Sequence, residues 1–122
     1  MSLKTVFILN TIIAGFFALV CLFIPSTMLS WYGVEFNDAT LLMTSFFGVG
    51  LLAVTLVTFY LRNSEFNPEV KSVVLALLLS DIVGVIVAIW GQVSNIVNTL
   101  GWLTVIIYGF FAIALLSIYF KK

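Results

Sequence analysis

The sequence predicts an all-α, polytopic membrane protein: a four-transmembrane-helix bundle built from two helical hairpins. Three observations predict this fold class. Of the 122 residues, 63% are hydrophobic and only 8% are charged, too few charges to cover the surface of a water-soluble domain. Long apolar stretches alternate with short segments that contain Pro, Asn or charged residues. Finally, Lys and Arg occur in only three places along the chain.

Four apolar stretches are long enough to cross a membrane. A hydrocarbon core about 30 Å thick needs roughly 20 apolar residues per helix. Within a single transmembrane domain, residues 1–122, the expected spans are approximately residues 5–24, 41–61, 72–90 and 100–120. Strands of a membrane β-barrel are about 10 residues long and alternate apolar with polar residues. Residues 73–79 and 82–90 are almost continuously apolar, so helices are predicted instead.

The basic residues predict how the chain is threaded through the membrane. They lie before the first span, between the second and third spans, and after the fourth, at Lys4, Arg62, Lys71, Lys121 and Lys122. The other two loops, residues 25–40 and 91–99, contain no Lys or Arg, and the first of them contains Glu35 and Asp38. Because cytoplasmic loops carry an excess of Lys and Arg, we expect a multi-pass protein of the cell membrane with cytoplasmic N- and C-termini.

Two segments next to the spans contain helix-start signals. Pro25 is expected to end the first span, and the amphipathic residues 26–33 are expected to form a short helix along the membrane surface, with Ser26 as its N-cap. Asn67 and Pro68 are expected to start the third long helix, since Pro is common at the first helical position.

Small and polar residues recur on one face of each span. Helices in lipid associate through close packing of small residues and through hydrogen bonds. The residues expected to pack helices together include Gly48, Thr55, Ser80, Gly84, Ala88 and Gly109. Gly109 coincides with Gly50 when residues 109–121 are aligned with residues 50–62, a match that either chance or internal duplication explains. We expect a compact bundle core rather than a ligand-lined cavity, with Leu78 facing lipid.

The sequence contains no recognisable catalytic or metal-binding motif. Histidine is absent, so Ser-His and Cys-His pairs are excluded, and no cluster of side chains has zinc-ligand spacing. Cys21 is the only cysteine, which excludes an internal disulfide and a Cys-x-x-Cys redox pair. The formal net charge is zero and no basic patch argues for nucleic-acid binding. We therefore expect no enzyme activity, no metal, no cofactor and no nucleic-acid partner.

Asp81 is the one acidic residue within an expected span. It lies near the centre of the third span, where a charge costs at least about 2.5 kcal/mol, so we expect an uncharged carboxylic acid at pH 7. Tyr108 is expected at a similar depth and could donate a hydrogen bond to Asp81, and Asn10 adds an amide in the first span. These three residues form a candidate intramembrane polar site. Both a structural and a functional role for Asp81 are open.

Two stretches of the chain carry a family pattern. They are Leu22-Phe23-Ile24-Pro25 followed by Trp31-Tyr32-Gly33-Val34, and Gly101-Trp102 followed by Tyr108 and Ala112. This pattern resembles that of small, uncharacterised bacterial and archaeal four-helix membrane proteins that are loosely related to the DoxX-like group. The resemblance implies a four-helix membrane bundle, and it implies no established activity.

Two functions follow from these observations as hypotheses. The first is a structural or accessory membrane subunit that packs against a second copy of itself or against a larger membrane complex. The small size and the small-residue faces favour it. The second is a small transporter or proton-coupled carrier that uses Asp81 at the membrane midplane. In both hypotheses the lipid bilayer surrounds the chain.

Overall fold

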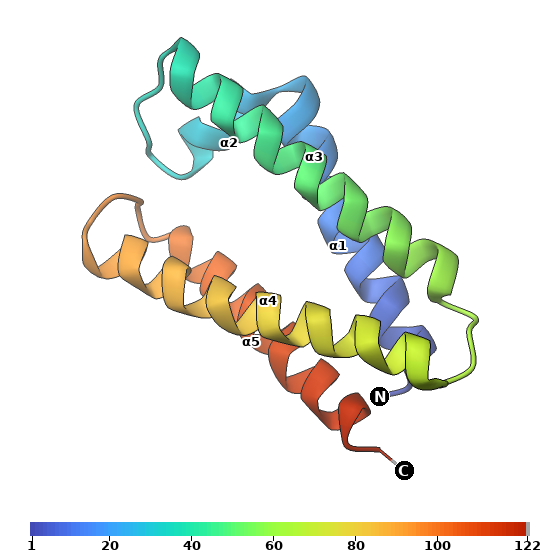
Figure 1. Ribbon diagram of the computed structural model, residues 1–122. Helices are drawn as coiled ribbons and strands as arrows, with labels where there is room; N and C mark the ends of the chain where they lie inside the picture. Colours follow the sequence, from blue (N-terminus) through green and yellow to red (C-terminus); the bar gives the residue numbers. More distant parts are fainter. Residues whose placement is uncertain (122) are drawn as a thin grey trace.

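The computed structural model describes residues 1–121 and contains helices and no strands in that part of the chain. The helices are α1 (Leu3–Phe23), α2 (Pro25–Trp31), α3 (Asp38–Leu61), α4 (Pro68–Val93) and α5 (Gly101–Tyr119). All except the short α2 are long and apolar enough to cross a membrane. The all-α fold class with four candidate spans is therefore confirmed (Figure 1). Lys122, one of the basic residues used for the topology, lies outside the described residues.

The starts of α1, α3 and α4 follow from side-chain capping. The Asn67 side chain accepts a hydrogen bond from the Val70 backbone N–H at 2.9 Å, and Pro68 is the first helical residue of α4, as expected. The expected Ser26 cap on α2 is wrong. Pro25 is the first residue of α2, so the N-cap position falls on Ile24, whose side chain has no hydrogen-bond acceptor.

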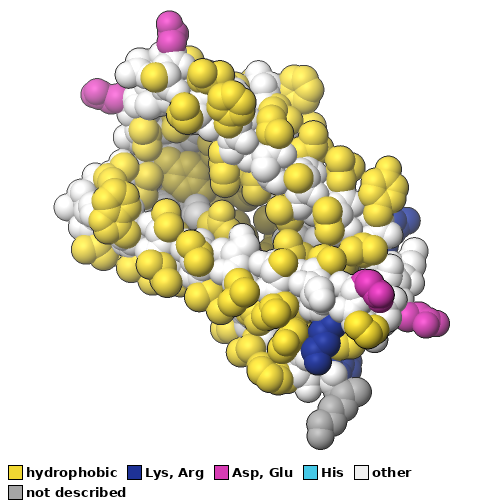
Figure 2. Space-filling view, in the orientation of Figure 1, with side chains coloured by type: hydrophobic (Ala, Val, Ile, Leu, Met, Phe, Trp, Pro, Cys, Tyr) yellow, Lys and Arg dark blue, Asp and Glu magenta, His cyan; other side chains and the backbone are white. Residues whose placement is uncertain are grey.

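The long helices form two hairpins, α1 with α3 and α4 with α5 (Figure 1). Both chain ends and the α3–α4 loop lie at one end of the molecule. We call this the basic end, because Lys4, Arg62, Lys71 and Lys121 lie there, as Figure 2 shows for the Lys and Arg side chains in view. The short helix α2 and the α4–α5 loop lie at the opposite end.

The α1–α3 hairpin packs through small and polar residues. A Cβ atom added at Gly48 would lie 2.9 Å from the Cys21 Cβ, so the two backbones approach closely at this point. Next to Gly15, the Thr55 side chain fills the corresponding space. The fully buried Thr58 hydroxyl forms a 2.9 Å hydrogen bond with the Thr11 hydroxyl across the interface. Gly48 and Thr55 thus lie where helix packing was expected.

The α4–α5 hairpin places an aromatic ring against a glycine. A Cβ atom added at Gly84 would lie 2.6 Å from Cδ1 of Tyr108, so the ring rests on the α4 backbone. Ala88 follows one turn later and is half-buried. Gly109 differs from the expectation, because a Cβ atom there would have no neighbour within 4 Å. Ser80 also differs, since it is exposed and lines a cavity instead of contacting another helix closely.

An apolar core joins the two hairpins at the basic end. Its buried residues come from α1, α4 and α5 and are Val6, Phe7, Val70, Val74, Leu78, Phe111, Ala114, Leu115 and Ile118. Leu78 is only 5% exposed, so the expectation that it faces lipid is wrong. The reason is that Leu78 lies in a core cluster to which α1 and α5 also contribute, so it is covered by protein and not by lipid.

Polar contacts join the hairpins at the opposite end. The Tyr32 and Thr104 hydroxyls form a 2.7 Å hydrogen bond. The Asn98 side-chain amide donates to the Trp31 carbonyl oxygen at 3.1 Å, and the Asn98 backbone N–H donates to the Tyr32 carbonyl oxygen at 2.9 Å. Between the two ends, α3 and α4 diverge from the loop that connects them (Figure 1). The hairpins therefore touch at both ends and separate between them.

Candidate ligand-binding cavity

A cavity of about 510 Å³ lies between the two hairpins, and all five helices line it. Figure 2 shows the hollow between the hairpins, with hydrophobic side chains around it. Its volume falls within the range of roughly 300–1,000 Å³ that is typical of small-molecule sites. The expected compact core is thus replaced by an open space in the middle of the molecule. The open space arises because α3 diverges from α4, which leaves the side chains that face each other too far apart to interdigitate.

The spacing of residues along α4 places Asp81 on the wall of this cavity. Val70, Val74, Leu77 and Asp81 are spaced four, three and four residues apart, so they share one helix face. That face is buried in the apolar core at the basic end and opens into the cavity at Asp81, in the middle of α4. The carboxyl group is half-buried there.

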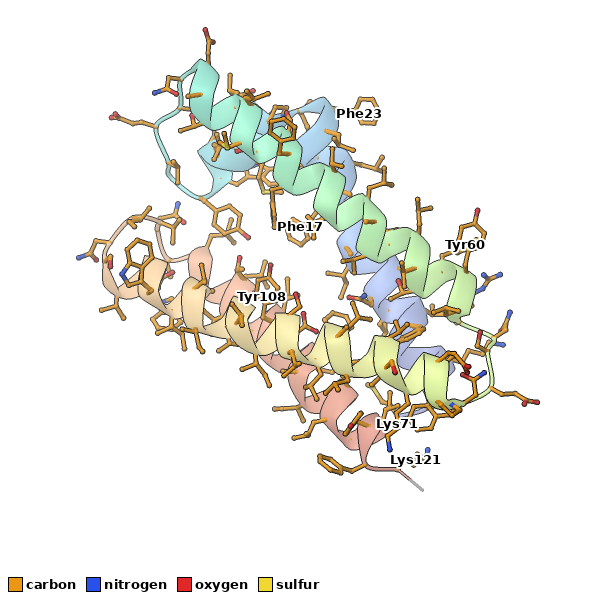
Figure 3. All side chains as sticks on the ribbon, in the orientation of Figure 1. Phe17, Phe23, Tyr60, Lys71, Tyr108 and Lys121 are labelled. Carbon is orange, nitrogen blue, oxygen red and sulfur yellow. The ribbon has the colours of Figure 1, made fainter. Side chains whose placement is uncertain are left out.

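Tyr108 lies next to Asp81 because of Gly84. Gly84 follows Asp81 by three residues, on the same side of α4, and the Tyr108 ring rests on it. Figure 3 shows Tyr108 between α4 and α5. Within residues 1–121, however, the expected hydrogen bond between the Tyr108 hydroxyl and the Asp81 carboxyl is not formed. Packing against Gly84, rather than the carboxyl group, therefore positions the ring.

Four polar side chains on the cavity wall have no protein partner. Asn10, Ser80, Asp81 and Tyr108 line the cavity from α1, α4 and α5, and in the described part of the chain their side chains make no hydrogen bond to another protein group. The other polar side chains are satisfied, since the Thr44 hydroxyl donates to the backbone and those of Tyr32 and Thr104 pair with each other. The structure thus brings the three residues of the predicted polar site to one cavity.

The rest of the lining is apolar and rich in aromatic rings. Phe17, Phe47 and Phe111 contribute from α1, α3 and α5, and Figure 3 shows Phe17 between the hairpins. Among the described residues, no Lys or Arg lines the cavity, and Asp81 is its only acidic side chain. The sequence did not indicate these aromatic residues as a group, because apolar periodicity does not distinguish a ring that faces a cavity from one that faces lipid.

The arrangement offers a small set of polar groups on an apolar surface. No group of three or more His, Cys, Asp or Glu side chains in residues 1–121 could hold a metal ion. The cavity offers one carboxyl group, one amide and hydroxyl groups on an apolar background. Such a surface can bind the polar end of an apolar molecule, and its carboxyl group can bind or release a proton.

Comparisons of the chain with protein-family models, with curated proteins and with solved structures find no match. The resemblance to the DoxX-like group therefore stays a prediction. The function has to be inferred from the cavity and from its residues. The most informative of these is Asp81, a carboxyl group in the middle of an apolar helix without a basic side chain beside it.

Proposed function

We propose that this protein is a small membrane carrier that binds an amphipathic molecule in the cavity between its hairpins, with Asp81 as the polar anchor. One observation carries the proposal: four polar side chains, those of Asn10, Ser80, Asp81 and Tyr108, face one cavity without protein hydrogen-bond partners in residues 1–121. Ionisable groups are costly within membrane spans, and those that occur there often mark substrate or proton pathways. A ligand would supply the partners that these groups lack.

The same carboxyl group provides a means of coupling to protons. A charge in an apolar setting is unfavourable, so we expect Asp81 to be protonated when no ligand is bound. A ligand that stabilises the carboxylate would release that proton, and a proton would in turn weaken the binding of the ligand. Infrared spectra should contain a protonated-carboxyl band at pH 7 that disappears in Asp81→Asn. A carboxylate that is fully ionised at pH 5 would refute this coupling.

An accessory-subunit function is the second candidate. The open space beside Gly109 favours it, because a second copy of the chain or a subunit of a larger complex could approach α5 closely there. This function does not account for the unpartnered polar groups on the cavity wall. The native mass of the protein in lipid nanodiscs distinguishes the two, since a strict monomer that binds a ligand supports the carrier alone.

We further propose that the protein lies in the cell membrane with the basic end in the cytoplasm. The gathering of Lys4, Arg62, Lys71 and Lys121 at this end supports the orientation, because Lys and Arg favour the cytoplasmic side. In this orientation the Tyr32–Thr104 hydrogen bond lies on the external side, and α1 and α5 run across the membrane between the two surfaces.

A matched pair of glycine variants tests the binding function. A Cβ atom at Gly50 or at Gly109 would meet no atom within 4 Å, so a larger side chain is tolerated at both positions. Gly50 lines the cavity and Gly109 does not. Gly50→Leu should therefore occupy cavity space, whereas Gly109→Leu is the control.

The probes are dodecylamine, dodecanoic acid and dodecanol, which share one alkyl chain and differ in the polar head. Thermal melts of the purified full chain are recorded with each probe. At least one probe should stabilise the unmodified protein and Gly109→Leu but not Gly50→Leu. If no probe stabilises the unmodified protein, or if Gly50→Leu responds like the control, the cavity is not a binding site.

A further inference from the structure

We infer that the ligand is a lipophilic organic cation that enters the cavity from the surrounding membrane, through the opening between α3 and α4. This inference rests on the proposed function and adds the charge of the ligand and its route. Three features carry it: the charge of the lining, the aromatic rings and the hollow between α3 and α4.

The charge of the lining favours a cation. Asp81 is the only acidic side chain on the cavity wall, and within the described residues no Lys or Arg side chain accompanies it. An ionised carboxylate in an apolar setting requires an opposite charge nearby. A cationic ligand supplies that charge, whereas an anionic ligand would add a second negative charge to an already unfavourable one.

The aromatic rings favour an organic cation with an apolar body. The faces of Phe and Tyr rings attract cations, most strongly where water is excluded. Phe17, Phe47 and Phe111 line the cavity together with the Tyr32 and Tyr108 rings. A bare metal cation would instead need several oxygen ligands. No group of three or more His, Cys, Asp or Glu side chains in residues 1–121 could provide them.

The cavity has an opening between α3 and α4. The apolar core closes the basic end, and the Tyr32–Thr104 and Asn98–Trp31 hydrogen bonds close the opposite end. On one flank α1 and α5 contact each other, and they share the apolar core at the basic end. On the other flank α3 and α4 diverge, and the hollow is visible between them in Figure 2. Because both helices are candidate membrane spans, this opening faces lipid, where lipophilic cations dissolve.

Cation binding at Asp81 excludes a proton from the same carboxyl group. The affinity for a permanent cation should therefore rise as the pH is raised, and binding should release a proton. The other titratable groups on the cavity wall are the Cys21 thiol of α1 and the phenols of Tyr32, directly after α2, and Tyr108 of α5, while the lining residues of α3 include none. All three are neutral when protonated, so Asp81 is the group that changes charge at mildly acid pH.

The test uses tetraphenylphosphonium and tetraphenylborate, which have the same shape and opposite charge. Equilibrium dialysis at pH 8 measures their binding to the full chain in nanodiscs of phosphatidylcholine, with empty nanodiscs as background. Tetraphenylphosphonium should bind saturably and at least about tenfold more tightly than tetraphenylborate. Asp81→Asn should weaken its binding about tenfold or more, whereas Asp38→Asn, an exposed acid at the start of α3, should leave it unchanged. Lowering the pH to 5 should weaken binding to the unmodified protein but not to Asp81→Asn.

Gly50→Phe tests the route, because a ring at this position would narrow the cavity on its α3 side. It should both slow the association of tetraphenylphosphonium and weaken its binding, and Gly109→Phe should do neither.

Specific outcomes would overturn each part of the inference. Equal binding of the two ions, or unchanged binding to Asp81→Asn, would refute the cationic ligand, while a response to the alkyl probes would leave the binding function standing. An unaffected association rate in Gly50→Phe would refute the route. A dimer that binds neither ion would show that a second copy covers the opening, and would overturn the route and the ligand together.

Discussion

Gly84→Ala is the most direct test of how the α4–α5 hairpin packs. The added Cβ atom would lie 2.6 Å from Cδ1 and 2.8 Å from Cγ of Tyr108. Rotation of the ring about its Cβ–Cγ bond does not move Cγ, so either α5 shifts or the whole Tyr108 side chain adopts another rotamer. Over-packing of this kind typically costs about 1–3 kcal/mol. Because Ala is a better helix former than Gly by about 1 kcal/mol, Gly109→Ala, which has open space, is the matched control.

The difference between the two variants isolates the steric cost, since both gain the same helix propensity. We expect Gly84→Ala to be less stable than Gly109→Ala by about 1–3 kcal/mol, measured by thermal melts in one detergent. A second comparison identifies the contact responsible. In a Tyr108→Leu background, where the ring is absent, Gly84→Ala should cause a smaller loss of stability. Two outcomes would refute the close packing of Tyr108 on Gly84. One is equal melting temperatures for the two alanine variants, and the other is an undiminished loss of stability when the ring is absent.

Three further predictions concern the core, a buried hydrogen bond and the orientation. Leu78→Ala should lower the free energy of unfolding by about 2–5 kcal/mol, whereas Leu79→Ala, at a 54% exposed position, should change it little; similar losses would contradict the assignment of the core. A double-mutant cycle of Thr11→Val and Thr58→Val should give a coupling of about 0.6 kcal/mol, and no coupling would mean that their hydrogen bond does not stabilise the hairpin. A reporter that is active only outside the cytoplasm should be active when fused near Asn37 and silent at the C-terminus, and the reverse pattern would invert the orientation.

Local physical chemistry made the helices predictable from sequence. An apolar stretch that crosses a bilayer must satisfy its backbone hydrogen bonds internally, and a helix does so within its own segment. The four long helices therefore follow from the length and composition of the apolar stretches. The start of α4 also follows from two adjacent residues, Asn67 and Pro68, because capping involves only the first turn. Where the signal was ambiguous, at Pro25 and Ser26, the N-cap lies at Ile24 instead of the expected Ser26.

The candidate site was only partly predictable. The cost of a charged group in lipid singled out Asp81 in the sequence. Its link to Tyr108 rested only on the similar depth in the membrane expected for the two residues. The hydroxyl pair of Tyr32 and Thr104 could not be foreseen, because 72 residues separate the two and no local pattern connects them. The aromatic wall, including Phe17, was equally hidden among the many apolar residues of the spans.

By itself, the sequence determined that the chain forms four apolar helices, where α4 begins, and that one of these helices contains an unusual acid. Only the tertiary structure decided which faces meet: Leu78 is buried in the core, Gly109 has open space, and Asp81 lies on a cavity instead of in a compact core. The physical reason is that helix formation depends on neighbours within about four residues. Contact between helices depends instead on their relative angle, and the divergence of α3 from α4 sets how much space remains between the hairpins.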